Sequence, residues 1–202
     1  MNLRARTSHE ESRDRICGVA EALFRQLGYV KTTVADIAQA LGMSSANVYR
    51  FFPSKSAIND AICRRILGDL QAQLAALARG PGAPAARIEA MVMAMHRHHK
   101  AQLTHERRVF DMVMAAMEEN WAAIEDHIAA CSAQFAAVVA QGMASGDFAP
   151  GDAAMQAEMV MKCCVFAFHP VLIAECGDRE LEPVVARLAR FAVRALCAKD
   201  SP

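Results

Sequence analysis

Residues 32–55, TTVADIAQALGMSSANVYRFFPSK, constrain the fold more than any other stretch of this chain. Thr33 is a favourable helix N-cap, and Asp36 three residues later completes the pattern of a capping box. Apolar residues then recur at the i, i+3, i+4, i+7 spacing of one helix face: Val34, Ile37, Ala38 and Leu41. This pattern predicts a short amphipathic helix that begins directly after Thr33.

A tight turn and a second helix are expected next. Gly42 stands where the left-handed backbone conformation that ends a helix costs least. Ser44 or Ser45 can cap the second helix, which we expect to run to about Phe52. Pro53 has no backbone N–H and disfavours helix in the residue before it, so the helix should end there. Helix, glycine turn and helix together predict a helix-turn-helix, a motif whose second helix enters the major groove of DNA.

The same stretch resembles the DNA-binding signature of the tetracycline-repressor (TetR) family of bacterial regulators. The segment EALFRQLGYVKTT before it and Ser54-Lys55 at its end also agree with that family. The resemblance covers residues 12–62 and is specific, because several spaced positions agree together. The remaining two thirds of the chain match the family only in length and helical character.

The resemblance implies which side chains meet DNA. Base edges are expected at Ser45, Ala46, Asn47 and Tyr49, and phosphates at Thr32, Thr33, Arg50 and Lys55, with Ser44 at the start of the recognition helix. These residue types suit such roles: an Asn amide pairs with adenine, an Ala methyl packs on a thymine methyl, and Lys, Arg and Thr bind phosphate. The resemblance also implies a homodimer on a pseudo-palindromic, double-stranded DNA operator.

The rest of the chain has a helical pattern throughout. Strand-type alternation is hard to find, which predicts an all-α fold of about nine helices. They are expected near residues 8–28, 33–41, 44–52, 54–77, 85–102, 104–117, 121–144, 153–176 and 179–197. Pro170 should kink the eighth of them. The predicted domains are a three-helix helix-turn-helix DNA-binding domain, 1–53, and a helical ligand-binding and dimerisation domain, 54–202.

The net charge is zero, but the charges are unevenly placed. Residues 1–65 hold ten Lys or Arg against six acids, a net charge of +4, and the remainder carries −4. A basic N-terminal third followed by an acidic remainder suits a protein that presents one end to phosphate. We find no apolar run of the ~18–20 residues that cross a bilayer, and the N-terminus lacks an apolar signal core. This predicts a cytoplasmic protein without a membrane partner.

The resemblance implies a small-molecule effector in the second domain. We expect an apolar pocket with a few polar groups, lined by Met91, Met95, His98, Gln102, Phe110, Met114, Met117, Trp121, Phe166 and His169. Such a pocket suits a mainly hydrophobic or aromatic effector, oriented by His98 or His169. No cofactor is expected. The alternative is a transition metal bound by His98, Asp111, Glu118 and His169.

Catalytic motifs such as G-x-S-x-G, a Walker loop or H-E-x-x-H are absent from the sequence. We therefore do not expect an enzyme, and the resemblance implies a ligand-released repressor. Its dimer should form through the helices at 153–176 and 179–197, whose apolar residues include Met159, Phe166, Val171, Val185, Leu188 and Phe191. The alternatives are a metal-responsive regulator of the same fold, an activator, and a helical enzyme or metal-storage bundle that does not bind DNA.

Overall fold

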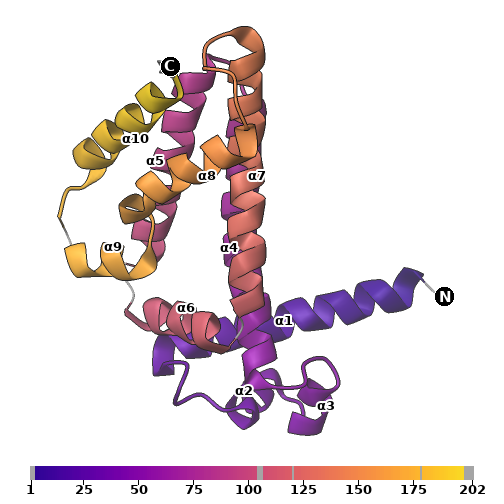
Figure 1. Cartoon of the computed structure of the whole chain (residues 1–202). Helices are drawn as coiled ribbons and strands as arrows, with labels where there is room; N and C mark the ends of the chain where they lie inside the picture. Colours follow the sequence, from indigo (N-terminus) through magenta and orange to yellow (C-terminus); the bar gives the residue numbers. More distant parts are fainter. Residues whose placement is uncertain (1–2, 104–106, 120, 178, 198–202) are drawn as a thin grey trace. The chain divides into compact units, whose positions relative to one another are not determined.

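The computed structural model describes residues 3–103, 107–119, 121–177 and 179–197, with only the backbone for some helix residues, Gln102 and Trp121 among them. Within these ranges it is all-α, as predicted, and has ten α-helices, one 3₁₀ helix and no strand (Figure 1). In chain order they are α1 (Leu3–Leu27), α2 (Val34–Leu41), α3 (Ser45–Tyr49), α4 (Lys55–Arg79), α5 (Pro84–Leu103), α6 (Arg107–Glu119), α7 (Trp121–Ser145), α8 (Ala153–Cys163), η1 (Val165–Ala167), α9 (Pro170–Cys176) and α10 (Glu182–Cys197).

The chain divides into two compact units. The first, here called the head, comprises Met1–Leu67 and Glu106–Ile124, and the second, the body, comprises Gly68–His105 and Glu125–Pro202. The domains expected from the sequence, 1–53 and 54–202, remain a sequence-based division. By packing, the first part of α4 and all of α6 belong with the helix-turn-helix.

The head has its own apolar core. Its largest fully buried side chains come from α1, α2, α4, α6 and the segment after α3: Ile16, Phe24, Ile37, Phe52, Ile58, Ile62 and Met112. Each such side chain contributes about 1.5–3 kcal/mol when it leaves water. The predicted apolar face of α2 is confirmed, since Val34, Ile37 and Ala38 are buried and Leu41 is partly buried against them.

The body has a second core, to which α4, α5, α7, α8 and α10 contribute. Its fully buried side chains include Leu70, Leu74, Ile88, Met91, Val92, Phe135, Val138, Val139 and Val185. On α10 the buried residues recur every three to four positions, at Val185, Ala189, Ala192, Val193 and Leu196. The spacing makes one stripe of α10 a core face and leaves its opposite stripe outside.

Several predicted helix boundaries are wrong. The helix expected to run from 153 to 176 is three elements, α8, η1 and α9, and Pro170 begins α9 instead of kinking a continuous helix. Proline suits that first position because its missing N–H would have no partner there and its φ is already helical. α1 begins at Leu3, five residues before the start at residue 8 that was expected from the sequence. The described residues therefore hold ten α-helices where about nine were expected.

One helix is long and apolar enough to meet the length and hydropathy test for a membrane span. It covers Ala123–Ser145 of α7, with a mean hydropathy of 1.3, whereas the sequence had suggested no such run. Its buried residues recur at helical spacing, at His127, Cys131, Phe135, Val138 and Val139. That single buried stripe is typical of a helix that packs in a protein core.

Candidate functional site

The N-terminus of α2 is held by the predicted capping box. The Thr33 hydroxyl accepts from the Asp36 N–H at 3.2 Å, and an Asp36 carboxylate oxygen accepts from the Thr33 N–H at 2.8 Å. The Thr33 hydroxyl also donates to that carboxylate at 2.7 Å, and the side-chain and backbone bonds from Thr33 lower the pKa of Asp36 below its usual value. Because all of these contacts lie within four residues, the sequence was sufficient to predict where α2 begins.

The turn and the second helix follow the predicted rule as well. Gly42 ends α2 in the left-handed conformation, at φ 68°, and its N–H bonds back to the last carbonyl groups of the helix. The Ser44 hydroxyl caps α3 by accepting from the Asn47 N–H at 3.2 Å. Of the two serines proposed as caps, Ser44 is the one used. α3 ends at Tyr49, earlier than the expected Phe52. The backbone N–H groups of Phe51 and Phe52 still donate to the Val48 carbonyl, so the chain continues in a turn after the helix.

α3 presents a polar, exposed side away from the head core. Val48 is fully buried, whereas Ala46 and Arg50 are exposed and Tyr49 is 51% exposed. Ser45 and Asn47 are half-buried, and the only described contact of the Asn47 amide nitrogen is a weak one to the Met43 sulfur at 3.7 Å. Of the side chains expected at base edges, Ala46 and Tyr49 are therefore exposed to solvent, and Ser45 and Asn47 are partly exposed.

Two residues expected at phosphates, Thr32 and Lys55, have contacts within the head. Thr32 is fully buried, and its hydroxyl donates to the Gly28 carbonyl at 2.9 Å. The Lys55 ammonium donates to the Tyr29 carbonyl at 2.8 Å and lies 4.3 Å from the centre of the Tyr29 ring. Thr33 by contrast is exposed. Burial removes the Thr32 side chain from the surface, and Lys55 holds the α1–α2 connection against the start of α4.

α1 supports the end of the recognition helix, which the sequence did not indicate. The Arg13 guanidinium donates to the Phe51 carbonyl and lies 4.0 Å above the centre of the Phe52 ring. The His9 ring lies 4.9 Å from the Phe51 ring. These partners are 38 or more residues apart, so no local spacing could have revealed them.

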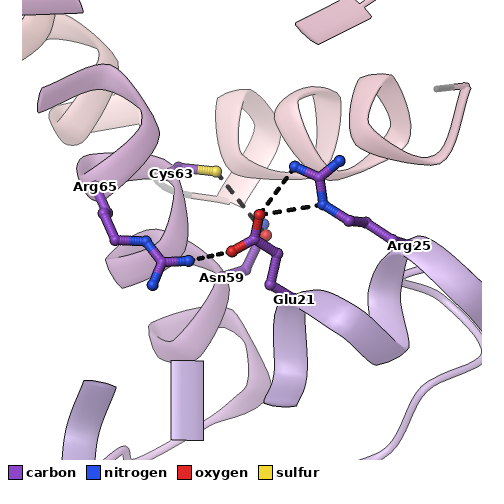
Figure 2. Close-up of polar contacts among 5 residues, drawn as sticks. All are labelled: Glu21, Arg25, Asn59, Cys63 and Arg65. Atoms are coloured by element: carbon purple, nitrogen blue, oxygen red, sulfur yellow. Dashed lines mark hydrogen bonds and ion pairs between the residues drawn. The ribbon is translucent and has the colours of Figure 1, made fainter. Parts of the chain in front are cut away.

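A polar cluster joins α1, α4 and α6 inside the head. Figure 2 shows the Glu21 carboxylate bound by Arg25, one turn along α1, and by Arg65 of α4. The buried Asn59 amide donates to the Met112 carbonyl of α6 at 3.1 Å. Arg108 of α6 also donates to the Arg25 carbonyl at 3.1 Å. These bonds account for the packing of α6 with the helix-turn-helix.

The residues expected to line an effector pocket are divided between the two units. Met91 and Met95 are buried in the body, where Phe166, His98 and His169 are partly buried. Phe110, Met114 and Met117 are partly buried and belong to the head. The side chains of Gln102 and Trp121 lie outside the described residues. Within the body, Met91, Met95 and Phe166 of this set share one apolar core.

Histidines gather in the body where α5 packs on η1 and α9. His96 is fully buried, and its Nδ1 lies 2.7 Å from the Ala167 carbonyl. His99 binds the Met95 carbonyl through Nδ1 at 2.8 Å, and burial lowers its pKa to about 4. Burial also lowers the pKa of His127 to about 4. Burial lowers the pKa of His98 as well, although the Asp69 carboxylate partly counteracts this shift. His98 and His169 were expected in the effector pocket from the sequence, whereas His96 was not among the expected lining residues.

The metal alternative has no supporting geometry. Among the side chains that the structure describes, no three His, Cys, Asp or Glu residues group closely enough to hold a metal ion. The set proposed from the sequence draws Asp111 and Glu118 from α6, where both are exposed, and its histidines from the body.

Comparison with known proteins gives matches to both units. A family described as "Bacterial regulatory proteins, tetR family" matches residues 16–62, and one described as "Tetracyclin repressor-like, C-terminal domain" matches residues 84–189. The HTH-type transcriptional repressor KstR2 of Mycobacterium tuberculosis is 28% identical over 141 residues, which cover 68% of this chain and 70% of that protein.

Solved structures agree in fold. A TetR/AcrR-family regulator from Thermobifida fusca superposes with a TM-score of 0.68 at 23% identity, over 91% of this chain and 97% of the other. Thermus thermophilus FadR, a TetR-family repressor solved with lauroyl-CoA, gives a TM-score of 0.66 at 16% identity, over 94% and 97%.

The capped helix-turn-helix and its relatives place the protein in a class, the DNA-binding transcriptional regulators, and not among enzymes. Within that class the chain belongs to the tetracycline-repressor family, because the match at residues 84–189 alone spans more than half of its length. The family resemblance drawn from residues 32–55 is confirmed. Regulators of this family bind DNA and small-molecule effectors.

Proposed function

We propose that the protein is a homodimeric repressor that binds a pseudo-palindromic operator and is released from it by a mainly apolar effector. The observation that carries the proposal is the exposed polar side of α3, presented on a helix-turn-helix whose caps and core are complete. Ser45, Ala46, Asn47 and Tyr49 read base edges. Thr33 and Arg50, both exposed, contact phosphates.

The dimer forms through one apolar stripe of α8 and α10. Met155 and Met159 of α8 are 61% and 46% exposed, and Val184 and Phe191 of α10 are 49% and 61% exposed. α8 and α10 pack against each other within the body, so these side chains lie on neighbouring helices. Exposed apolar side chains gathered in this way are typical of a homodimer interface. Val185, expected there from the sequence, is instead fully buried in the core of the body.

The effector binds in the body and has a mainly apolar frame. Support comes from the buried Met91 and Met95 and from the partly buried Phe166, which offer flexible apolar contacts. The structural relative FadR was solved with lauroyl-CoA, whose acyl chain is likewise apolar. For release, the effector must bind the DNA-incompetent state more tightly than the DNA-competent one. The protein acts in the cytoplasm, where its DNA is found.

The direct test measures DNA binding and oligomeric state together. A binding site is selected from a random DNA library with the full-length protein, and its affinity is then measured by fluorescence anisotropy. Analytical ultracentrifugation should give a dimer, which Phe191→Glu converts to a folded monomer with weaker binding to the palindrome. Selection of no preferred sequence, or a Phe191→Glu protein that stays dimeric, would refute the corresponding part of the proposal. Reporter expression with the regulator present and absent separates a repressor from an activator.

A further inference from the structure

Three imidazole nitrogens in the body are buried and have no hydrogen-bond partner. They are Nε2 of His96, Nε2 of His98 and Nδ1 of His169. His96 stands out because its whole side chain is inaccessible to solvent. A buried polar atom without a partner is energetically costly, so several of them in one region indicate a missing partner, such as a bound ligand.

The three histidines belong to one region of the fold. His96 on α5 bonds to Ala167 at the end of η1, and His169 follows two residues later at the start of α9. The His98 and His99 rings lie 5.6 Å apart, and the His99 ring lies 6.5 Å from Phe168. His96, His98 and His127 all influence the titration of His99. The region thus joins α5, α7 and the η1–α9 segment.

Hydrogen bonding determines which nitrogen of His96 carries the proton. A carbonyl oxygen can only accept, so the 2.7 Å contact with Ala167 requires a proton on Nδ1. In the neutral ring Nε2 is then a bare acceptor. The bond from His99 to the Met95 carbonyl fixes the same tautomer there. His96 therefore offers an acceptor that only a hydrogen-bond donor can satisfy.

The surroundings do not favour an anion. The cations next to these histidines on α5 are already engaged: Arg97 binds Glu182 through both carboxylate oxygens, and Lys100 donates to the Arg179 carbonyl. Burial keeps the rings of His99 and His127 uncharged at neutral pH, since each has a pKa of about 4. A carboxylate placed beside His99 and His127 would meet uncharged rings and would lose its hydration without compensation.

We propose that this histidine cluster binds the polar end of the effector, and that His96 selects an uncharged hydrogen-bond donor, such as a hydroxyl, over a carboxylate. The inference rests on the proposed effector function, because it specifies the chemistry of the same ligand. The apolar frame of that ligand would contact Met91, Met95 and Phe168 near the cluster. His96 is then a specificity-determining residue.

Three matched probe sets test the inference. Each keeps one apolar frame and changes its polar end from a hydroxyl to a methyl ether to a carboxylate: a dodecyl chain, a naphthalene ring and a steroid. Affinities for the full-length protein at pH 7.5 are measured by thermal shift and isothermal titration. In at least one set the alcohol should bind about tenfold more tightly than the ether, since one hydrogen bond is lost. The carboxylate should be the weakest of the three.

Variants connect the preference to His96. His96→Leu should remove the alcohol-over-ether preference, whereas His96→Gln, which keeps both a donor and an acceptor, should retain part of it. If His96→Leu does not fold, the ¹⁵N resonance of His96 Nε2 in the wild-type protein provides the readout, and it should move when the alcohol is added. His9→Gln, a histidine of the head, is the matched control and should leave every affinity unchanged.

Three results would overturn the inference. They are a carboxylate that binds as tightly as its alcohol, a preference that survives His96→Leu, and no binding by any of the three alcohols, which would assign the unpartnered nitrogens to ordered water. DNA release is measured separately with the selected site. An alcohol that binds through His96 without releasing DNA would refute the proposed release mechanism and leave the site intact.

Discussion

The head and the body differ in how completely their buried polar side chains are hydrogen-bonded. In the head, the buried Thr32 and Asn59 and the partly buried Glu21 all have partners within the protein. Six buried side-chain atoms without a partner are found among the described residues, and five of them, in Arg87, His96, His98, Gln156 and His169, lie in the body. The sixth belongs to Asp60 in the head. Nearly all described buried polar atoms of the head therefore have hydrogen-bond partners, which suits a unit that binds DNA through its outer surface. The body keeps buried polar atoms without partners, which suits a unit that binds a ligand in its interior.

The two stripes of α10 should give the largest contrast. Val185→Glu places a charge in the fully buried core of the body and should cost about 5 kcal/mol, enough to unfold that unit. Phe191→Glu, on the exposed stripe, should leave the fold intact and weaken only the dimer. Urea unfolding followed by far-ultraviolet circular dichroism measures the first effect and ultracentrifugation the second. Equal loss of stability in both variants would contradict the assignment of the two stripes.

Acid should weaken the body before the head. The pKa of His99 and of His127 falls from 6.5 in the unfolded chain to about 4 in the folded one, so between these values the unfolded chain binds more protons. Stability is therefore lost as the pH drops from 6.5 towards 4, by about 2 kcal/mol per histidine at pH 5.

Hydrogen exchange of α5 and α7, compared with α1 and α2, measures this acid effect in each unit. The double variant His99→Gln, His127→Gln should lose most of the pH dependence. Equal acceleration of exchange in head and body at pH 5 would contradict the prediction.

Asn47 tests whether the head works through its outer surface. Asn47→Ala should remove discrimination at one base position of the selected site, worth ~1–3 kcal/mol, and leave the stability of the head unchanged. Affinities for the selected site and for its single-base variants give the measurement. An unaltered base preference at every position would show that Asn47 does not read a base.

Arg13 tests whether the scaffold positions that surface. Arg13→Gln removes the guanidinium from the Phe51 carbonyl and the Phe52 ring, so the end of α3 should become less ordered and operator affinity should fall about tenfold, or ~1.4 kcal/mol. The dependence of affinity on salt should not change, because Arg13 is not expected at a phosphate. Arg15→Gln, whose weak 3.4 Å bond to the Leu41 carbonyl is exposed, is the matched control. A reduced salt slope in Arg13→Gln would make Arg13 a DNA contact.

The smallest expected effects are those of Lys55 and Arg50 substitutions, which should differ in whether head stability or the salt dependence of DNA affinity changes. Lys55→Met loses the bond to the Tyr29 carbonyl and should cost the head about 1 kcal/mol with an unchanged salt slope. Arg50→Gln, at an exposed position, should leave stability alone and reduce the salt slope by about 1. Salt titrations of DNA affinity for both variants decide between an internal and a phosphate role. A reduced salt slope in Lys55→Met, with an unchanged slope in Arg50→Gln, would show that Lys55 contacts phosphate.

The local structure of the head could be predicted from the sequence because its signals act over a few residues. The Thr33–Asp36 capping box, the left-handed Gly42 and the Ser44 cap each involve partners no more than five positions apart. Such contacts form wherever the residues occur in that order, so the spacing alone indicates a helix-turn-helix. The family followed from the same stretch, and the matches at 16–62 and 84–189 confirm it.

Only the tertiary structure decided what depends on partners far along the chain. Both stripes of α10 are apolar, and packing in the body selects Val185 for the core and leaves Phe191 exposed. His96 meets Ala167 across 71 positions, and Lys55 meets Tyr29 across 26, so neither contact has a sequence period. Helical periodicity records which residues share a face, whereas burial and hydrogen-bond partners depend on which element packs against that face.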